Sequence, residues 1–163
     1  MRMLIAALLL ITGCTREMTW PLVDRAISAQ FPEVRFISTD SLASLLESGR
    51  KPLLLDVRTA EEFDVSHLLG AERVDPDSLS WSGDDSTRLV VTYCSVGYRS
   101  AAMAERLQES GYRNVVNLRG SIFRWANERR PVYRDSVQVH DVHPFDAVWA
   151  GLLDARLRSD EPR

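Results

Sequence analysis

Val90-Val91-Thr92-Tyr93-Cys94-Ser95-Val96-Gly97-Tyr98-Arg99-Ser100 is the stretch that decides the fold of this chain. Its first four residues are β-branched or aromatic, as in a buried strand, and a short loop with one glycine follows Cys94. Residues 98–110 then have the periodicity of a helix, and Gly111 ends it. A strand that passes through a tight loop into a helix is the building unit of a parallel α/β sheet.

Cys94 lies where this strand meets the loop, and its position favours a reactive thiol. Backbone N–H groups at a helix N-terminus point into one concavity and carry partial positive charge. Cysteines placed in this way have pKa values of about 3.5–7.5, so they are nucleophiles at neutral pH. The alternative is a structural cysteine that serves as a small buried hydrophobe. Gly97 and Arg99 in the same loop favour the nucleophile.

Short apolar strands alternate with short helices on both sides of this unit. We expect strands at 34–37, 53–56, 71–74, 89–93 and 115–118, and helices at 20–30, 41–48, 60–65, 98–110 and 121–127. Thr39 or Asp40 is the expected cap of the second helix, and 75–86 is the expected loop. Asp56 and Cys94 both follow strands, so we expect them at the carboxyl edge of the sheet, where α/β proteins bind ligands.

The loop from Cys94 to Arg99 has the pattern C-x-x-x-x-R and resembles the active-site loop of the rhodanese family, in which C-x-x-G-x-R is common. Three further segments resemble motifs of that family: Leu53-Leu54-Leu55-Asp56-Val57-Arg58, Glu61-Glu62-Phe63-Asp64-Val65-Ser66-His67-Leu68-Leu69-Gly70-Ala71, and Val115-Val116-Asn117-Leu118-Arg119-Gly120-Ser121-Ile122 with Trp125. Ser66, Leu69 and Ser121 stand where the family usually has glycine, proline and glycine. The resemblance covers residues 35–133.

This resemblance implies a rhodanese-like α/β fold, with a central parallel sheet, helices on both faces and extra N- and C-terminal helices. It also implies a sulfurtransferase that needs no cofactor. Cys94 would become a persulfide by taking sulfur from a donor such as thiosulfate, and a thiol or cyanide would accept the sulfur. Arg99 would bind an anionic donor and order the loop, while the loop residues Ser95, Val96, Gly97, Tyr98 and Ser100 would hold the terminal sulfur.

The roles of several neighbouring residues stay open. Asp56 and Arg58 either pair structurally at the sheet edge or order the active loop, and His67 is expected to be structural. Ser100 either donates a hydrogen bond to the thiolate or caps the helix.

Two other functions remain as alternatives. The chain is either an enzyme or a module that holds a persulfide or a partner without turnover. Phosphatases of the cell-division-cycle type and arsenate reductases resemble this family, but their loop has one more residue. The shorter loop here favours a sulfane sulfur over a tetrahedral oxyanion.

The N-terminus predicts export. An apolar run, 4–11, follows Arg2, and Ile11-Thr12-Gly13-Cys14 resembles a bacterial lipobox. We expect a lipoprotein signal peptide at 1–13 and a lipidated Cys14 that anchors the protein to a membrane, on the periplasmic or extracytoplasmic side. The outer membrane is favoured if the host has two membranes. The alternative is an uncleaved apolar anchor.

Composition excludes several classes of function. The formal net charge of −3 gives no electrostatic basis for nucleic-acid binding. With Cys14 lipidated, Cys94 is the single free thiol, so an internal disulfide and a two-thiol oxidoreductase are excluded. His140 and His143 are near each other but have no adjacent third ligand, so we expect no metal site.

Two regions lie outside the resemblance. Residues 14–34 are expected to be a linker and a helix, and 134–163 a C-terminal extension with an amphipathic helix at 145–158. Its apolar stripe consists of Phe145, Val148, Trp149, Leu152, Leu153 and Leu157. We expect this helix to pack on its own domain, and the alternative is a surface for a protein partner in the cell envelope.

Overall fold

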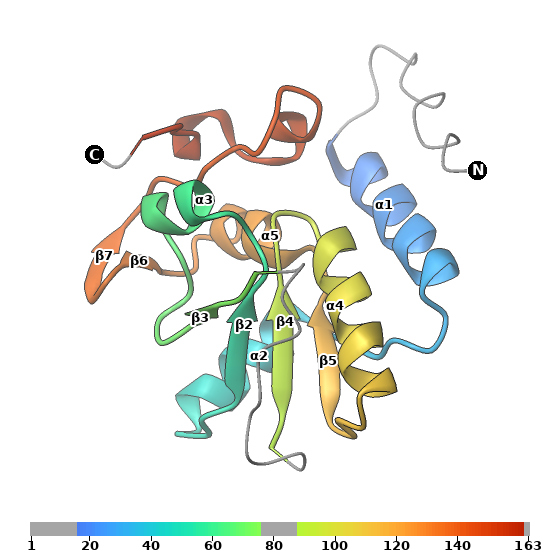
Figure 1. The fold of residues 1–163 in the computed structure, drawn as a ribbon. Coiled ribbons are helices and arrows are strands. Elements are labelled where there is room, and N and C mark those ends of the chain that lie inside the picture. Colours follow the sequence, from blue (N-terminus) through green and yellow to red (C-terminus); the bar gives the residue numbers. More distant parts are fainter. Residues whose placement is uncertain (1–15, 76–87, 162–163) are drawn as a thin grey trace.

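The computed structural model describes residues 16–75 and 88–161, which form one α/β domain around a parallel sheet (Figure 1). The sheet has the strand order β1-β5-β4-β2-β3, and all its pairs are parallel. The strands are β1 (Phe36–Ile37), β2 (Leu53–Asp56), β3 (Glu72–Arg73), β4 (Val90–Tyr93) and β5 (Val115–Leu118). The fold class that we expected is confirmed.

Helices cover both faces of this sheet, because its central strands are buried on both sides. They are α1 (Arg16–Gln30), α2 (Thr39–Glu47), α3 (Ala60–Val65), α4 (Tyr98–Glu109) and α5 (Ser121–Asn127). Apolar residues of α4 pack in one core cluster and those of α2 and α5 in the other, while α1 contributes to both.

The strand register sets the position of the site. Asp56, the last residue of β2, is opposite Tyr93, the last residue of β4. Cys94 follows Tyr93 directly, so Asp56 and Cys94 lie at the same carboxyl edge of the sheet. In Figure 1 this edge points upward, toward α3 and the red C-terminal extension.

Most expected elements are present with small shifts at their ends. Helix α1 begins at Arg16, before the expected start at Trp20. The cap of α2 is Ser38, and the expectation of Thr39 or Asp40 is wrong. Ser38 has an extended backbone, and its hydroxyl accepts a hydrogen bond from the N–H of Ser41 at 3.0 Å. An antiparallel hairpin of β6 (Val132–Arg134) and β7 (Val137–Val139) was not expected.

The C-terminal extension contains helical turns, but the single amphipathic helix expected over 145–158 does not form. Two short 3₁₀ helices are present, η1 (Trp149–Leu152) and η2 (Ala155–Leu157). Leu153 between them has extended backbone angles. The Asn127 side chain stabilises this break, since its amide donates to the Leu152 carbonyl at 2.8 Å and accepts from the Asp154 N–H at 2.9 Å.

Among residues 16–75 and 88–161, no helix combines the length and the apolar character needed to cross a membrane. The proposed lipidation site, Cys14, lies outside these described residues.

Candidate active site

Cys94 lies in a tight loop between β4 and α4, and its side chain is enclosed. The residue is 1% exposed and is a free cysteine. Its sulfur accepts hydrogen bonds from the N–H of Gly97 at 3.1 Å and from the hydroxyl of Ser100 at 3.5 Å. Gly97 is the N-cap of α4 with a φ of 114°, a conformation that glycine adopts without strain. The loop therefore points donors of the α4 N-terminus at the sulfur.

These contacts favour the thiolate. Burial raises the pKa of Cys94, but the charge of Arg99 and the hydrogen bonds from Ser100 and Gly97 outweigh it, so the pKa is below that of an ordinary thiol. Two roles were left open for Ser100. Its hydroxyl donates a hydrogen bond to the Cys94 sulfur, and no side chain caps α4.

Arg99 forms a closed network with Glu62 and Ser95. Its two terminal nitrogens donate to the two carboxylate oxygens of Glu62, each at 2.8 Å, and one of them also donates to the Ser95 hydroxyl at 2.9 Å. Ser95 donates in turn to Glu62 at 2.8 Å. Such bidentate pairs are strong and geometrically specific. Arg99 is thus linked to helix α3 through a carboxylate.

Glu62 is a site residue that sequence reasoning missed. It is 2% exposed and forms a capping box with Thr59 at the start of α3. Burial raises the pKa of Glu62, but the hydrogen bonds and charge of Arg99, with the Thr59 N–H and the Ser95 hydroxyl, lower it to about 2. The T-x-x-E pattern of Thr59 and Glu62 predicts a capping box from sequence. Only the fold brings that carboxylate to Arg99.

Two further side chains support the loop. The Ser121 hydroxyl accepts from the N–H of Cys94 at 3.1 Å and donates to the Leu118 carbonyl at 3.2 Å. The Asn117 amide donates to the Gly97 carbonyl at 2.8 Å. Ser121 occupies a position where a glycine was expected, and its backbone has a φ of 49°. A glycine here would relieve the backbone strain but would leave the buried N–H of Cys94 without the hydroxyl that accepts its hydrogen bond.

Asp56 and Arg58 form a fully buried ion pair next to the loop. The Arg58 guanidinium donates to both Asp56 oxygens, with the shortest contact at 2.6 Å, and also to the Ser66 carbonyl at 2.6 Å. Ser66 has an extended backbone with a φ of −171°, which any residue adopts. Its departure from the family glycine is therefore compatible with the turn.

The C-terminal extension reaches the site through Phe145. The Arg99 guanidinium carbon lies 4.4 Å from the centroid of the Phe145 ring. Phe145 is 40% exposed, has a φ of 68° and donates its N–H to Nδ1 of His143 at 3.0 Å. Sequence reasoning missed this contact and assigned Phe145 to a helical stripe.

The other expected residues have varied positions. Val96 is buried in the core, and Tyr98 is exposed and packs edge-on against Phe31. The His67 ring stacks on Phe63 at 4.0 Å. Among the described residues, no cluster of three or more metal-ligating side chains is present, and His143 instead accepts the Phe145 hydrogen bond.

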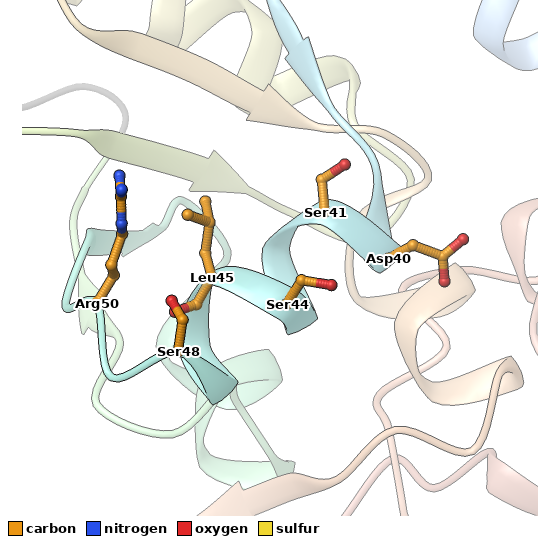
Figure 2. A pocket seen from close by; sticks show the side chains of 6 residues that line it. All are labelled: Asp40, Ser41, Ser44, Leu45, Ser48 and Arg50. Carbon is orange, nitrogen blue, oxygen red and sulfur yellow. The ribbon is translucent and has the colours of Figure 1, made fainter.

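A separate open hollow of about 620 Å³ lies along α2. Figure 2 shows the side chains that line it: Asp40, Ser41, Ser44, Leu45, Ser48 and Arg50. None of them contributes to the network around Cys94, so we do not assign the active site there.

Comparison with known proteins agrees with this geometry. The family model of the rhodanese-like domain matches residues 38–128. A sulfurtransferase from Allochromatium vinosum is 33% identical over 108 residues, which are 61% of this chain and 94% of that protein. A probable adenylyltransferase/sulfurtransferase MoeZ from Mycobacterium tuberculosis is 36% identical over 109 residues, 64% of this chain, but the match spans only 28% of that longer protein.

A solved structure supports the same assignment. The crystal structure of a rhodanese-related protein from Thermoplasma volcanium has a TM-score of 0.55 and 25% identity, and the match covers 62% of this chain and 99% of that one. The family model covers more than half of the chain, and the Cys94 loop and the parallel sheet agree with it, so this chain belongs to the family of rhodanese-like domains.

Proposed function

We propose that this protein is a sulfurtransferase that carries sulfane sulfur as a persulfide on Cys94. The observation that carries the proposal is the enclosed Cys94 sulfur, which accepts hydrogen bonds from Gly97 and Ser100 and has a lowered pKa. A thiolate is the nucleophile that attack on a sulfane sulfur requires.

The proposed reaction has two displacements. With thiosulfate as donor, the electron pair of the Cys94 thiolate forms a bond to the outer sulfur, and the sulfur–sulfur bond of thiosulfate breaks to release sulfite. The product is a Cys94 persulfide anion. Cyanide or a thiolate then attacks the terminal sulfur, and the Cys94 thiolate leaves. Backbone N–H groups of the loop from Ser95 to Ser100 stabilise the charge on the terminal sulfur, as an oxyanion hole does for oxygen.

The geometry at Arg99 favours sulfur transfer over phosphate or arsenate chemistry. Glu62 and Ser95 accept hydrogen bonds from both terminal nitrogens of Arg99. Phosphate or arsenate would need those donors for itself, and so would the sulfonate group of thiosulfate, whereas a sulfane-sulfur donor without such a group would not. The six-residue loop agrees, since it is shorter than the loop of the related phosphatases and arsenate reductases.

The alternative is a carrier that holds a persulfide for a partner without turnover. Cys94 is 1% exposed, so a donor reaches the sulfur only when the surrounding side chains move. Slow access of this kind limits repeated turnover more than it limits a single loading, and it therefore favours the carrier.

The test is the intact mass of the protein after incubation with thiosulfate, together with thiocyanate release when cyanide is added. We expect a gain of one sulfur atom in the wild type and none in Cys94→Ser, whose hydroxyl does not ionise in this range. Sulfur gain in Cys94→Ser would contradict the proposal. Sulfur gain in the wild type without repeated turnover would identify the carrier.

We also propose that Cys14 is lipidated after removal of residues 1–13 and anchors the protein on the extracytoplasmic side of a membrane. The lipobox-like sequence supports this proposal. Cys14→Ser should move the protein to the soluble fraction and remove acyl labelling. A variant that stays membrane-bound with its N-terminus intact would instead identify the apolar run as the anchor.

A further inference from the structure

Phe145 of the C-terminal extension covers the arginine of the active site, although the family match ends at residue 128. The Arg99 guanidinium carbon lies over the aromatic ring, while Glu62 and Ser95 accept hydrogen bonds from its two terminal nitrogens. These contacts leave the Arg99 side chain 26% exposed, so much of this cation is engaged before any donor arrives.

The charges next to Cys94 cancel in pairs. Arg99 is paired with Glu62, and Arg58 is paired with Asp56. Arg58 also interacts electrostatically with both Glu62 and Arg99, so the two pairs form one neutral group. Arg99 already stabilises both Glu62 and the Cys94 thiolate, so a donor that carries two negative charges would have to share this guanidinium with them.

Phe145 also adds exposed aromatic surface beside Arg99. Its residue is 40% exposed, and its ring centroid lies 4.4 Å from the Arg99 guanidinium carbon. An organic substituent on a donor can pack on this ring, whereas an inorganic dianion gains nothing from it.

The local backbone holds Phe145 in this place. A bulky residue at a φ of 68° is strained, and such strain persists where surrounding contacts fix it. Here His143 accepts the Phe145 N–H, and Asp146 accepts the N–H groups of Val148 and Trp149 at 2.8 and 2.9 Å. Val142 and Leu153, which precede and follow this segment in the sequence, are both buried and hold it on the domain.

We propose that Phe145 is a specificity-determining residue, which covers Arg99 and makes the site prefer an organic hydropersulfide over dianionic thiosulfate as sulfur donor. This inference rests on the proposed sulfurtransferase function. In the preferred reaction the Cys94 thiolate attacks the outer sulfur of R–S–SH, the sulfur–sulfur bond breaks, and the organic thiolate R–S⁻ leaves. Cys94 then carries the persulfide with its proton.

The test compares kcat/KM for thiosulfate and for tert-butyl hydropersulfide, which carries at most one negative charge, with cyanide as acceptor. Phe145→Ala should raise the thiosulfate-to-hydropersulfide ratio by about 2-fold to about 30-fold, the range that corresponds to one cation–π contact. Phe145→Leu should move the ratio in the same direction, and it decides the question if the alanine variant does not fold. Phe145→Tyr should keep the wild-type ratio.

Val148→Ala is the matched control, because Val148 lies in the same extension and is 59% exposed. Val148→Ala should leave kcat/KM unchanged for both donors. An unchanged ratio in Phe145→Ala and Phe145→Leu, or an equal change for both donors, would overturn the specificity role while sulfur transfer itself stands. A wild-type protein that gains no sulfur from either donor would overturn the proposed function and this inference with it.

Discussion

At the scale of single residues, the site depends on how burial and hydrogen bonding compete at two ionisable groups. Cys94 and Glu62 are both enclosed, and burial alone would raise the pKa of both groups. Donors aimed at each group reverse that effect, and the pKa values of both are lowered. Removing single donors should therefore change titration behaviour more than it changes the fold.

Ser100→Ala should raise the pKa of the Cys94 thiol, because a hydrogen bond to the charged form is lost. The rate of alkylation of Cys94 should rise with pH in both proteins, with the midpoint of the variant at higher pH. Ser110→Ala, at the other end of α4, is the control, since its hydroxyl donates to the Arg106 carbonyl. Coincident profiles for Ser100→Ala and wild type would show that the hydroxyl does not act on the thiolate.

Glu62 should make the free energy of unfolding depend on pH in the acidic range. Its pKa is about 2 in the folded protein and 4.5 ordinarily, so its contribution is complete above pH 4.5 and is lost as the pH falls through about 2. A shift of this size corresponds to about 3 kcal/mol. Glu62→Gln should lower the free energy of unfolding by about that amount at neutral pH and flatten its decline in acid. Urea unfolding across this pH range measures both effects.

Glu109→Gln is the matched control for that experiment, because Glu109 is exposed on α4. It should leave the pH dependence as in the wild type. If Glu62→Gln loses stability in acid as steeply as the wild type, the decline arises from other carboxyl groups.

At the scale of elements, the strand and helix ends beside the site were the most predictable part of the fold. The expected bounds of β2, α3, β5 and α5 agree with the structure, since apolar runs and cap residues mark them in the sequence. The loop from Cys94 to Arg99 could be located for the same reason. Its partners could not, because Glu62 and Ser121 come to it from other elements through tertiary contacts.

The turn before α5 offers a test at this scale. Ser121 combines a left-handed backbone with a hydroxyl that accepts the buried Cys94 N–H. Ser121→Ala keeps the strain and leaves that N–H without its partner, so it should cost about 1–3 kcal/mol. Ser121→Gly loses the same hydrogen bond but relieves the backbone, and should be less destabilising than alanine by about 1 kcal/mol. A lower thermal unfolding midpoint for Ser121→Gly than for Ser121→Ala would contradict this account.

At the scale of the whole molecule, the parts outside the family match were the hardest to predict. A periodic stripe over 145–158 is typical of an amphipathic helix, but two short 3₁₀ helices form instead. Asn127 binds backbone groups on both sides of the break, and a distant side chain of this kind leaves no trace in local periodicity. Phe145, which the stripe would place on a core-facing helix, lies over Arg99 instead.

The extension should nevertheless unfold together with the domain. Leu153 is 1% exposed in the same core cluster as Ile122 and Phe123 of α5, so Leu153→Ala should cost about 2–5 kcal/mol. Val148→Ala, at an exposed position of the same segment, should stay within about 0.5 kcal/mol of the wild type. Far-ultraviolet circular dichroism and tryptophan fluorescence should report one coincident transition, because Trp149 of the extension and Trp125 of α5 pack in that one cluster. Two separate transitions, or a Leu153→Ala protein as stable as Val148→Ala, would make the extension an independent arm, and its contact with Arg99 would then form and break without unfolding the sheet.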